Sequence, residues 1–445
     1  MVLIILLICA LTVFEVAESA ELPAFPGAEG FGSIAVGGRG GKIILVTNLN
    51  ANGPGSLQAA CEEMGPRIVV FQVGGLIRGD IVIKYPYITI AGQTAPSPGI
   101  TIEGRLLSQA KDGGRLHDII VRFIRVRPAP TTGHTGDAVQ LPKTERVILD
   151  HLSLSWANDE IIDIIHSSEF TVQWSTIEES DTEGHAKGRG HNFGIISTYP
   201  QSGNISIHHN LFAHQSRRSP SLTPYVTGKP GDFRNNVVYN FREGLTHDGH
   251  VPKEASNFIN NYYKRGPNSK TIIPFTFHPK GRYFLEGNFV DGVGLINDRG
   301  VLWTKLPGWL RFNRTGTHLA QPIAVAPVVT HTAQEAYKMV LSKAGCFPRD
   351  LVTTRTIREV LEGSGKWGRN APSALSDDWF FTGLKRDAPA VDSDGDGMPD
   401  EWEDAHGLNK LDNQDYNRIF ESGYTAIEEY MNERAKRLIN TKPIY

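Results

Sequence analysis

The fold is decided by a series of short runs in the middle of the chain: ISIHHNLFAH (205–214), FRNNVVYNF (233–241), NFINNYYK (257–264) and YFLEGNFV (283–290). Runs rich in β-branched and aromatic residues are typical of β-strands. Such runs recur roughly every 23 to 35 residues, and helical periodicity is nearly absent between them, which argues against βαβ units. The pattern predicts an all-β fold, a right-handed parallel β-helix in which each coil buries its inner side against its neighbours.

One amide recurs at the same point of these runs, before an aromatic or aliphatic pair: Asn210, Asn236, Asn261 and Asn288. Stacked at a turn, such amides can hydrogen-bond along the solenoid, which is a structural role. The competing architecture is a β-sandwich, whose strands follow one another about every 8 to 12 residues. The wider spacing in this chain favours the β-helix.

Composition sets the broad class of the protein. The chain has 445 residues, of which 40% are hydrophobic and 21% charged, enough for a large core in one long domain or about two to three ordinary ones. The 45 basic and 48 acidic residues nearly balance at a net charge of -3. Because no basic footprint is present, we expect no nucleic-acid partner.

The N-terminus carries an apolar run from Val2 to Phe14 that is too short to span a bilayer and ends before the small residues Ala17 and Ser19. It predicts a signal peptide at 1–20 and a secreted, extracellular protein, although the usual Lys or Arg before the run is missing. An uncleaved anchor is the alternative. No other long apolar run exists, so we expect no membrane span in the mature chain.

Cysteines and glycosylation sequons fit a secreted protein. Cys9 leaves with the signal peptide, and Cys61 and Cys346 are too few for a disulfide scaffold, so they either pair or stay buried and free. Asn204 and Asn313 begin sequons, which makes the chain a candidate glycoprotein.

The pattern changes after about residue 300. TAQEAYKMVLSKAGC (332–346) and TRTIREVLEGSG (354–365) predict helices that end near Gly. DSDGDGMPDEWE (392–403) has the spacing of an EF-hand-like calcium loop, with Gly397 at position 6. Its acids, at positions 1, 3, 5, 9 and 12, are Asp392, Asp394, Asp396, Asp400 and Glu403.

Calcium in this loop would be structural and would clamp a terminal helix, YTAIEEYMNERAKRL (424–438). An acidic solvated linker is the alternative. The expected domains are therefore a β-helix at 21–300, a partly helical extension at 301–390, and the calcium-loop segment with its terminal helix at 391–445.

Two further motifs are interpreted as structural. GGRGGK (37–42) lacks the earlier Gly and the following Ser/Thr of a phosphate-binding loop, so it predicts a tight turn at the entry of the fold. His208 and His209 are adjacent and would face opposite sides of a strand, one inside and one outside. No third ligand stands at zinc-site spacing.

The stretch WANDEIIDII (156–165) places carboxylates in an otherwise apolar strand. On an extended strand Asp159 and Asp163 share one face and Glu160 takes the other, and Asp137, one strand earlier, can join the first face. Three converging carboxylates suit calcium, whereas the alternative is a solvated acidic face. Lys187 and the pair Arg217–Arg218 fall at analogous ends of the next coils, so acids and bases would line one groove.

Several motifs match one known family together and in order: FPGAEGFG (25–32), GGRGGK, NGPGSLQAAC (52–61), GPRIVVFQVGG (65–75), ITIAGQTAP (88–96), ILDHLSLSWANDE (148–160) and IHHNLFAHQSRRSP (207–220). From Ala24 to about Val290 the chain resembles secreted family 1 pectate lyases, and its acidic loop is similar to one at the C-terminus of many of them. The resemblance implies a parallel β-helix that cleaves α-1,4-linked polygalacturonate, the backbone of pectin, by β-elimination with Ca²⁺. A monomer is expected.

The resemblance also implies roles for individual residues. Asp137, Asp159 and Asp163 match the calcium-binding acids of the family, and Thr135 stands where the family has a further acid. Lys187 matches the Lys that binds substrate.

The proton-abstracting Arg of the family is matched by Arg218, two residues before Pro220, with Arg217 beside it as a substrate-binding residue. Ser221 and Thr223 stand where the family commonly has Arg, so one carboxylate clamp is missing. Arg normally stays protonated, so the resemblance rather than general chemistry carries the role of base.

Two other functions fit the same solenoid. An inverting glycosidase would use Asp159 or Glu160 as acid and Asp163 as base, without calcium. A non-catalytic pectin-binding solenoid would explain the missing Arg positions. The row of Lys and Arg beside the acids favours the lyase.

Overall fold

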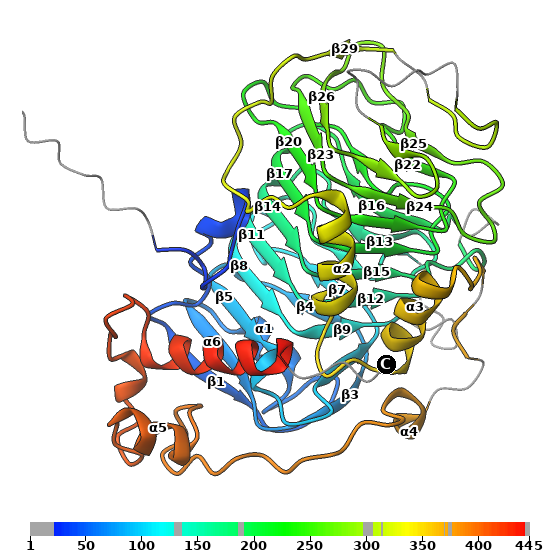
Figure 1. The fold of residues 1–445 in the computed structure, drawn as a ribbon. Coiled ribbons are helices and arrows are strands. Elements are labelled where there is room, and N and C mark those ends of the chain that lie inside the picture. Colours follow the sequence, from blue (N-terminus) through cyan, green and yellow to red (C-terminus); the bar gives the residue numbers. More distant parts are fainter. Residues whose placement is uncertain are drawn as a thin grey trace, which may run out of the picture.

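The computed structural model describes residues 22–128, 136–185, 191–296, 306–312, 315–368, 370–372 and 376–440. Its strands stack into three long parallel sheets, named A, B and C, that form a β-helix (Figure 1). The predicted all-β parallel β-helix is therefore confirmed. The predicted signal peptide at 1–20 and the sequon residue Asn313 lie outside the described residues.

Sheet A runs in the order β1 (Lys42–Val46), β2 (Arg67–Phe71), β5 (Ile88–Ala91), β8 (Leu116–Arg122), β11 (Thr144–Asp150), β14 (Ser168–Gln173), β17 (Gly203–His208), β20 (Gly231–Arg234), β23 (Ser256–Ile259), β26 (Arg282–Glu286) and β29 (Thr317–His318). Sheet B contains β3 (Gly75–Arg78), β6 (Ile100–Glu103), β9 (Ile124–Val126), β12 (Ser153–Ser155), β15 (Thr176–Glu178), β18 (Leu211–Ala213), β21 (Val237–Tyr239), β24 (Tyr262–Lys264), β27 (Phe289–Val290) and the antiparallel β28 (Gly294–Leu295). Sheet C contains β4 (Ile81–Ile83), β7 (Leu106–Ser108), β10 (Val139–Gln140), β13 (Glu160–Asp163), β16 (Phe193–Ser197) and β19 (Ser221–Leu222). A separate pair, β22 (Glu243–Leu245) and β25 (Ile273–Phe275), follows β19.

The central coils contribute one strand to each sheet in turn. β11, β12 and β13 follow one another along the chain, and β14, β15 and β16 form the next coil. Strands of one sheet pair in parallel between coils, with Val147 opposite Phe170 and Val172 opposite Ile207. Their inward side chains join one continuous apolar core that includes Ile162. Equivalent positions of successive coils are therefore stacked in rows along the solenoid.

The asparagine ladder is confirmed. The backbone N–H of Asn210 donates to Asn236 Oδ1 at 3.0 Å, that of Asn236 to Asn261 Oδ1 at 3.0 Å, and that of Asn261 to Asn288 Oδ1 at 3.1 Å. All four side chains are buried. Each amide thus satisfies a backbone donor at a corner where the sheets' own hydrogen bonds stop.

The helices are α1 (Leu57–Glu62), α2 (Ala333–Lys343), α3 (Leu351–Glu362), α4 (Asp377–Phe380), α5 (Asp400–His406) and α6 (Ala426–Ile439), with 3-10 turns η1 (Phe31–Ile34), η2 (Gly92–Thr94) and η5 (Asp415–Asn417). The three helices predicted after residue 300 are present as α2, α3 and α6. In Figure 1, α2 and α3 lie along sheet B, whereas α6 lies beside the first strands of sheet A. The short α1 was not predicted; its Leu57 and Ala60 pack into the core. Within the described residues, no helix has the length and apolar character needed to cross a membrane.

Several smaller expectations are settled by the structure. Cys61 and Cys346 are buried and free rather than paired. GGRGGK forms turns around Gly38, where a Cβ would come 1.8 Å from the Arg67 carbonyl oxygen, so the turn needs glycine.

The expectation for the two adjacent histidines is wrong. His208 and His209 are both buried, and their Nδ1 atoms are 3.0 Å apart. His208 ends β17, and His209 follows with a positive φ of 55°. Because this corner is not extended, the two-residue alternation of a strand does not apply to it.

Candidate functional site

Charged residues gather where successive coils enter sheet C. Asp137 lies just before β10, Asp159 immediately before β13, and Arg218 just before β19. Glu160 is paired with Phe193 at the start of β16, and Phe193 is bridged in turn to the residue before Arg218. The stacking of coils therefore brings together an acid–arginine cluster, defined as Asp137, Asp159, Glu160, Asp163 and Arg218.

Asp137 is a buried acid of this cluster. Its Oδ1 accepts a hydrogen bond from the Glu160 backbone N–H at 2.9 Å, and its Oδ2 accepts one from Gln140 Nε2 at 3.0 Å. Burial, followed by the charges of Asp163 and Asp159, raises the pKa of Asp137 well above its usual value. The protein places this carboxylate where a negative charge is costly unless a cation joins it.

Strand alternation predicted that Glu160 would lie away from the other acids, but the structure places it beside them. One carboxylate oxygen each of Asp137, Asp159 and Glu160 lie within 4.8 Å of one another. The reason is that β13 begins only at Glu160, so Asp159 precedes the strand and is not subject to its alternation. Glu160 is also nearly inaccessible to solvent.

Asp163 stands next to this group of three. Its Oδ1 accepts the backbone N–H of Ile165 at 2.9 Å, and its Oδ2 lies 3.5 Å from Gln140 Nε2, the amide that also binds Asp137. Burial is the main cause that raises the pKa of Asp163, and the charge of Asp159 adds to it. Asp163 therefore lies beside the group formed by Asp137, Asp159 and Glu160, but outside it.

Arg218 is held between two carboxylates. Its Nη1 forms an ion pair with Glu160, and its Nη2 lies 3.0 Å from Asp248 Oδ1. The guanidinium lies over the Phe193 ring at 4.1 Å from the centroid. The backbone of Arg218 has a φ of 60°, so this residue lies at a turn and not in an extended strand.

The other predicted cationic residues are placed differently. Arg217 pairs with Glu243 at 3.1 Å, and its guanidinium carbon is 5.9 Å from the same Phe193 ring. Lys187 lies outside the described residues. Of the two arginines, Arg218 therefore belongs to the acid–arginine cluster and Arg217 lies beside it.

Three residues at the cluster were not singled out from the sequence. His185 Nε2 lies 3.2 Å from Asp159 Oδ2, and His191 Nδ1 contacts the other oxygen of the same carboxylate. Their rings stack with centroids 3.9 Å apart. Arg105, held by Asp80 at 2.6 Å, acts on Asp137 by lowering its pKa, although burial has the larger, opposite effect. No spacing in the sequence indicates these long-range partners.

The C-terminal acidic loop brings its carboxylates together in two overlapping groups. Ligand oxygens of Asp392, Asp394 and Asp396 lie within 4.8 Å of one another, as do those of Asp396, Glu403 and Asp415. Asp415, which comes from η5, was not predicted.

Asp400, predicted at position 9 of the loop, lies outside both groups. It accepts hydrogen bonds from the backbone N–H of Ser393 at 2.8 Å and from its hydroxyl at 2.7 Å. Its role in the structure is therefore to hold the start of the loop against α5.

Several carboxylate oxygens in this loop are buried without a hydrogen-bond partner among the described residues, including both oxygens of Glu403. Burial and neighbouring acids raise the pKa of Glu403 to about 8 and that of Asp396 to about 7. Such an arrangement is unfavourable for carboxylates alone and fits a bound cation.

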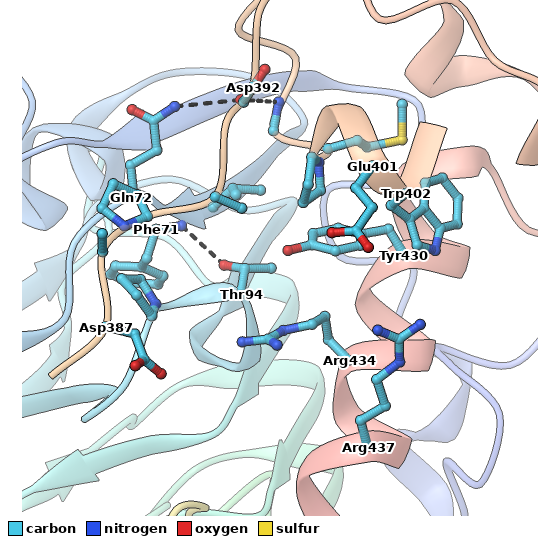
Figure 2. Close-up of a pocket in the computed structure, with 18 of the residues that line it drawn as sticks. Phe71, Gln72, Thr94, Asp387, Asp392, Glu401, Trp402, Tyr430, Arg434 and Arg437 are labelled. Atoms are coloured by element: carbon cyan, nitrogen blue, oxygen red, sulfur yellow. Dashed lines mark hydrogen bonds between the residues drawn. The ribbon is translucent and has the colours of Figure 1, made fainter. Parts of the chain in front are cut away.

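Figure 2 shows a pocket beside this loop, where the C-terminal segment meets the first coils. Its volume is about 360 Å³, and its lining includes Thr94 from η2, Trp402 from α5 and Tyr430 from α6. Arg434 and Arg437 extend into view from α6. None of the acid–arginine cluster lines it, so this pocket is separate from the candidate site.

Comparison with known proteins gives the chain its family. A probable pectate lyase C from Neosartorya fischeri is 35% identical over 444 residues, covering 96% of this chain and 97% of that protein. The chain belongs to the pectate lyase family. A probable pectate lyase C from Aspergillus terreus is 36% identical over 427 residues, covering 93% and 94% of the two chains. The family resemblance seen in the sequence motifs is thereby confirmed.

Solved structures in the same family are more distant. A pectate lyase from Bacillus sp. N165, in complex with trigalacturonate, shares 16% identity at a TM-score of 0.47 and covers 72% of this chain and 98% of that one. Pectate lyase C from Erwinia chrysanthemi, determined with Ca²⁺, shares 16% identity at a TM-score of 0.43 and covers 72% and 96%. No model of a known protein family matches the chain.

Proposed function

We propose that this family member is a secreted pectate lyase that cleaves α-1,4-linked polygalacturonate by calcium-assisted β-elimination and releases 4,5-unsaturated oligogalacturonides. The observation that carries the proposal is the contact of Arg218 with an acid of the buried carboxylate group. An elimination needs both a cation site for the substrate carboxylate and a base beside it, and this cluster offers both.

The acids fit calcium by their chemistry. They are hard oxygen ligands, as Ca²⁺ prefers, and the burial that raises the pKa of Asp137 and Asp163 makes their negative charges costly without a cation. Asp137, Asp159 and Glu160 would hold the ion, with Asp163 as a further carboxylate. When bound, calcium would neutralise the substrate carboxylate and increase the acidity of the adjacent C5–H.

Arg218 is the proposed base, and its neighbours control whether it can act. A guanidinium in ion pairs with Glu160 and Asp248 is protonated and cannot accept a proton. Glu160 also belongs to the group of three carboxylates with Asp137 and Asp159. If Glu160 bound a cation there, its ion pair with Arg218 would be released. The Phe193 ring packs against the guanidinium of Arg218 and helps to position it. Nearby calcium and Lys cations would favour loss of a guanidinium proton to solvent. The neutral nitrogen would then take the C5 proton while the C4–O bond breaks and the leaving oxygen takes a proton from solvent, so the activity should increase at alkaline pH.

Substrate binding would rest on Lys187, by family resemblance, with Arg217 at the edge of the cluster. The positions where the family commonly has further Arg carry Ser221 and Thr223, whose small side chains are fully buried. This chain therefore supplies fewer cations for uronate carboxylates than the family pattern, and a weaker affinity for substrate follows.

A glycosidase is disfavoured by the partners of the acids. An inverting hydrolase needs one carboxyl as acid and a second, across a water, as base. Here Asp159 is held by His185 and His191, and Glu160 is paired with Arg218. Neither acid is available to donate a proton to a leaving group.

The C-terminal loop is proposed as a second, structural calcium site. Asp392, Asp394, Asp396 and Glu403 would bind the ion together with Asp415, while Asp400 fixes the loop through Ser393. The loop lies next to α6, which packs on sheet A, so the ion would hold the segment at 391–445 against the β-helix domain.

One assay tests the proposed function. Purified protein is incubated with polygalacturonate, and the ultraviolet absorbance of unsaturated uronides is followed with and without a chelator. A lyase gives a rise that the chelator abolishes. Reducing ends without that rise would indicate a hydrolase, and binding with neither signal would indicate a non-catalytic solenoid.

A further inference from the structure

Two buried histidines and a glutamate meet against sheet A, outside the acid–arginine cluster. His208 ends β17, His209 follows it, and Glu29 precedes η1. One ring nitrogen of each histidine and one carboxylate oxygen of Glu29 lie within 4.8 Å of one another. His208 is 0% and His209 1% exposed, and Glu29 is half-buried. The sequence alone does not bring Glu29 near the histidines.

The rings of the two imidazoles are nearly perpendicular, with centroids 5.3 Å apart and an interplanar angle of 87°. Burial is the main cause that lowers the pKa of His208 to about 3 and that of His209 to about 2. Their Nδ1 atoms are 3.0 Å apart. The other nitrogen of His208, Nε2, is buried and has no hydrogen-bond partner among the described residues. A metal ligand must be a neutral imidazole whose lone pair points at the ion, and a bound ion would replace the present contact between the two Nδ1 atoms.

The surroundings supply the outer contacts of a metal site. His209 Nε2 lies 3.1 Å from His331 Nδ1, as a ligating imidazole needs a partner for its second nitrogen. Glu29 Oε2 accepts the backbone N–H of Val329 at 3.2 Å, which orients the carboxylate. The nearby Arg234 forms a two-point ion pair with Asp232 at 2.6 Å, and its positive charge still acts to lower the pKa of Glu29, His208 and His209.

We propose that Glu29, His208 and His209 form a structural site for one Zn²⁺ ion, completed by water. Two nitrogens and one oxygen suit a borderline divalent ion, whereas calcium prefers oxygen ligands throughout. Zinc–nitrogen bonds of about 2.0 to 2.1 Å place tetrahedral ligand nitrogens roughly 3.3 Å apart. The Nδ1 atoms at 3.0 Å need to separate by only a few tenths of an ångström.

The site would join three segments that are distant in sequence. The N-terminal segment containing Glu29 lies beside β11 and β14 (Figure 1) and contacts the segment before α2 through Gly30 and Pro327. His331 belongs to that second segment, and the histidine pair belongs to the β-helix. Zinc would therefore clamp the N-terminal segment and the approach to α2 onto sheet A, and would stabilise the folded chain by linkage.

The test measures zinc binding to the full-length, metal-stripped protein with Ca²⁺ in excess, so that oxygen sites are occupied. We expect one tightly bound Zn²⁺ by calorimetry and by metal analysis, a rise in Tm with zinc, and visible absorption of a tetrahedral Co²⁺ substitute. Glu29→Gln keeps the shape of the side chain and should weaken zinc binding about tenfold or more, as should His208→Gln. His331→Gln should weaken binding through His209 by about tenfold.

The matched control is His191→Gln, because His191 belongs to the other group of histidines, at Asp159. It should leave the zinc stoichiometry and affinity unchanged. Absence of calcium-resistant zinc binding, or equal affinity in wild type and Glu29→Gln, would overturn the proposal in favour of a metal-free histidine pair. Loss of zinc with His191→Gln but not with Glu29→Gln would place the ion at Asp159 and would also overturn it. Because Glu29 is only half-buried, its variant is expected to fold even if His208→Gln does not.

Discussion

Replacement of Arg218 by Lys separates the charge of this residue from its geometry. Arg218 reaches Glu160 and Asp248 with two different nitrogens, and a Lys ammonium can keep only one of these contacts at a time. If Arg218 is the base, kcat should fall by about 10² to 10⁴, the range that a positioned base contributes. This corresponds to roughly 3 to 5 kcal/mol of activation free energy at about 1.36 kcal/mol per decade. The free energy of unfolding should fall by less than about 3 kcal/mol, because one ion pair remains.

The assay is the initial ultraviolet rise with polygalacturonate at saturating calcium, combined with a urea titration of each variant. Arg217→Lys is the matched control, since Arg217 pairs with Glu243 and its side chain is 31% exposed. We expect it to change kcat by no more than about twofold. Full activity of Arg218→Lys, or loss of activity in Arg217→Lys alone, would refute the assignment of the base.

Three other outcomes follow from the same structure. Glu160→Gln should raise the calcium concentration for half-maximal activity by about tenfold, because it removes one charged ligand of the group; an unchanged calcium titration would exclude Glu160 from that group. In calcium-free buffer the unfolding free energy should decrease as pH rises from about 5 to about 8, since the folded state, with the pKa of Glu403 at about 8, binds more protons than the unfolded state. Thermal melts of Glu403→Gln should show a much smaller slope, and a slope equal to that of wild type would contradict this account. Asn236→Ala should lower the unfolding free energy by about 2 to 4 kcal/mol in urea titrations, because it removes a buried amide that binds Asn210 and the Ile207 carbonyl; a loss below about 1 kcal/mol would show that the ladder is not stabilising.

The sequence by itself determined the solenoid and its regular features. Strand runs at coil-length intervals and the repeated asparagine could be interpreted because each coil pairs with the next one, as Val147 does with Phe170. Helix α2 was also predicted from its residue pattern, and the structure adds a capping box of Thr332 and Glu335 at its N-terminus. These features depend on residue spacing and on neighbouring coils, and spacing is what a sequence displays.

The tertiary structure alone decided which charged groups meet. Strand alternation placed Glu160 away from Asp159 and separated His208 from His209, but in both pairs one residue lies at a corner rather than in a strand. Corner residues with positive φ, such as Arg218 and His209, direct their side chains by the local turn and not by a two-residue period. Other contacts join segments far apart in the chain, as Glu29 does with Val329. No spacing specifies such contacts, because they form only when the terminal segments pack against the completed β-helix.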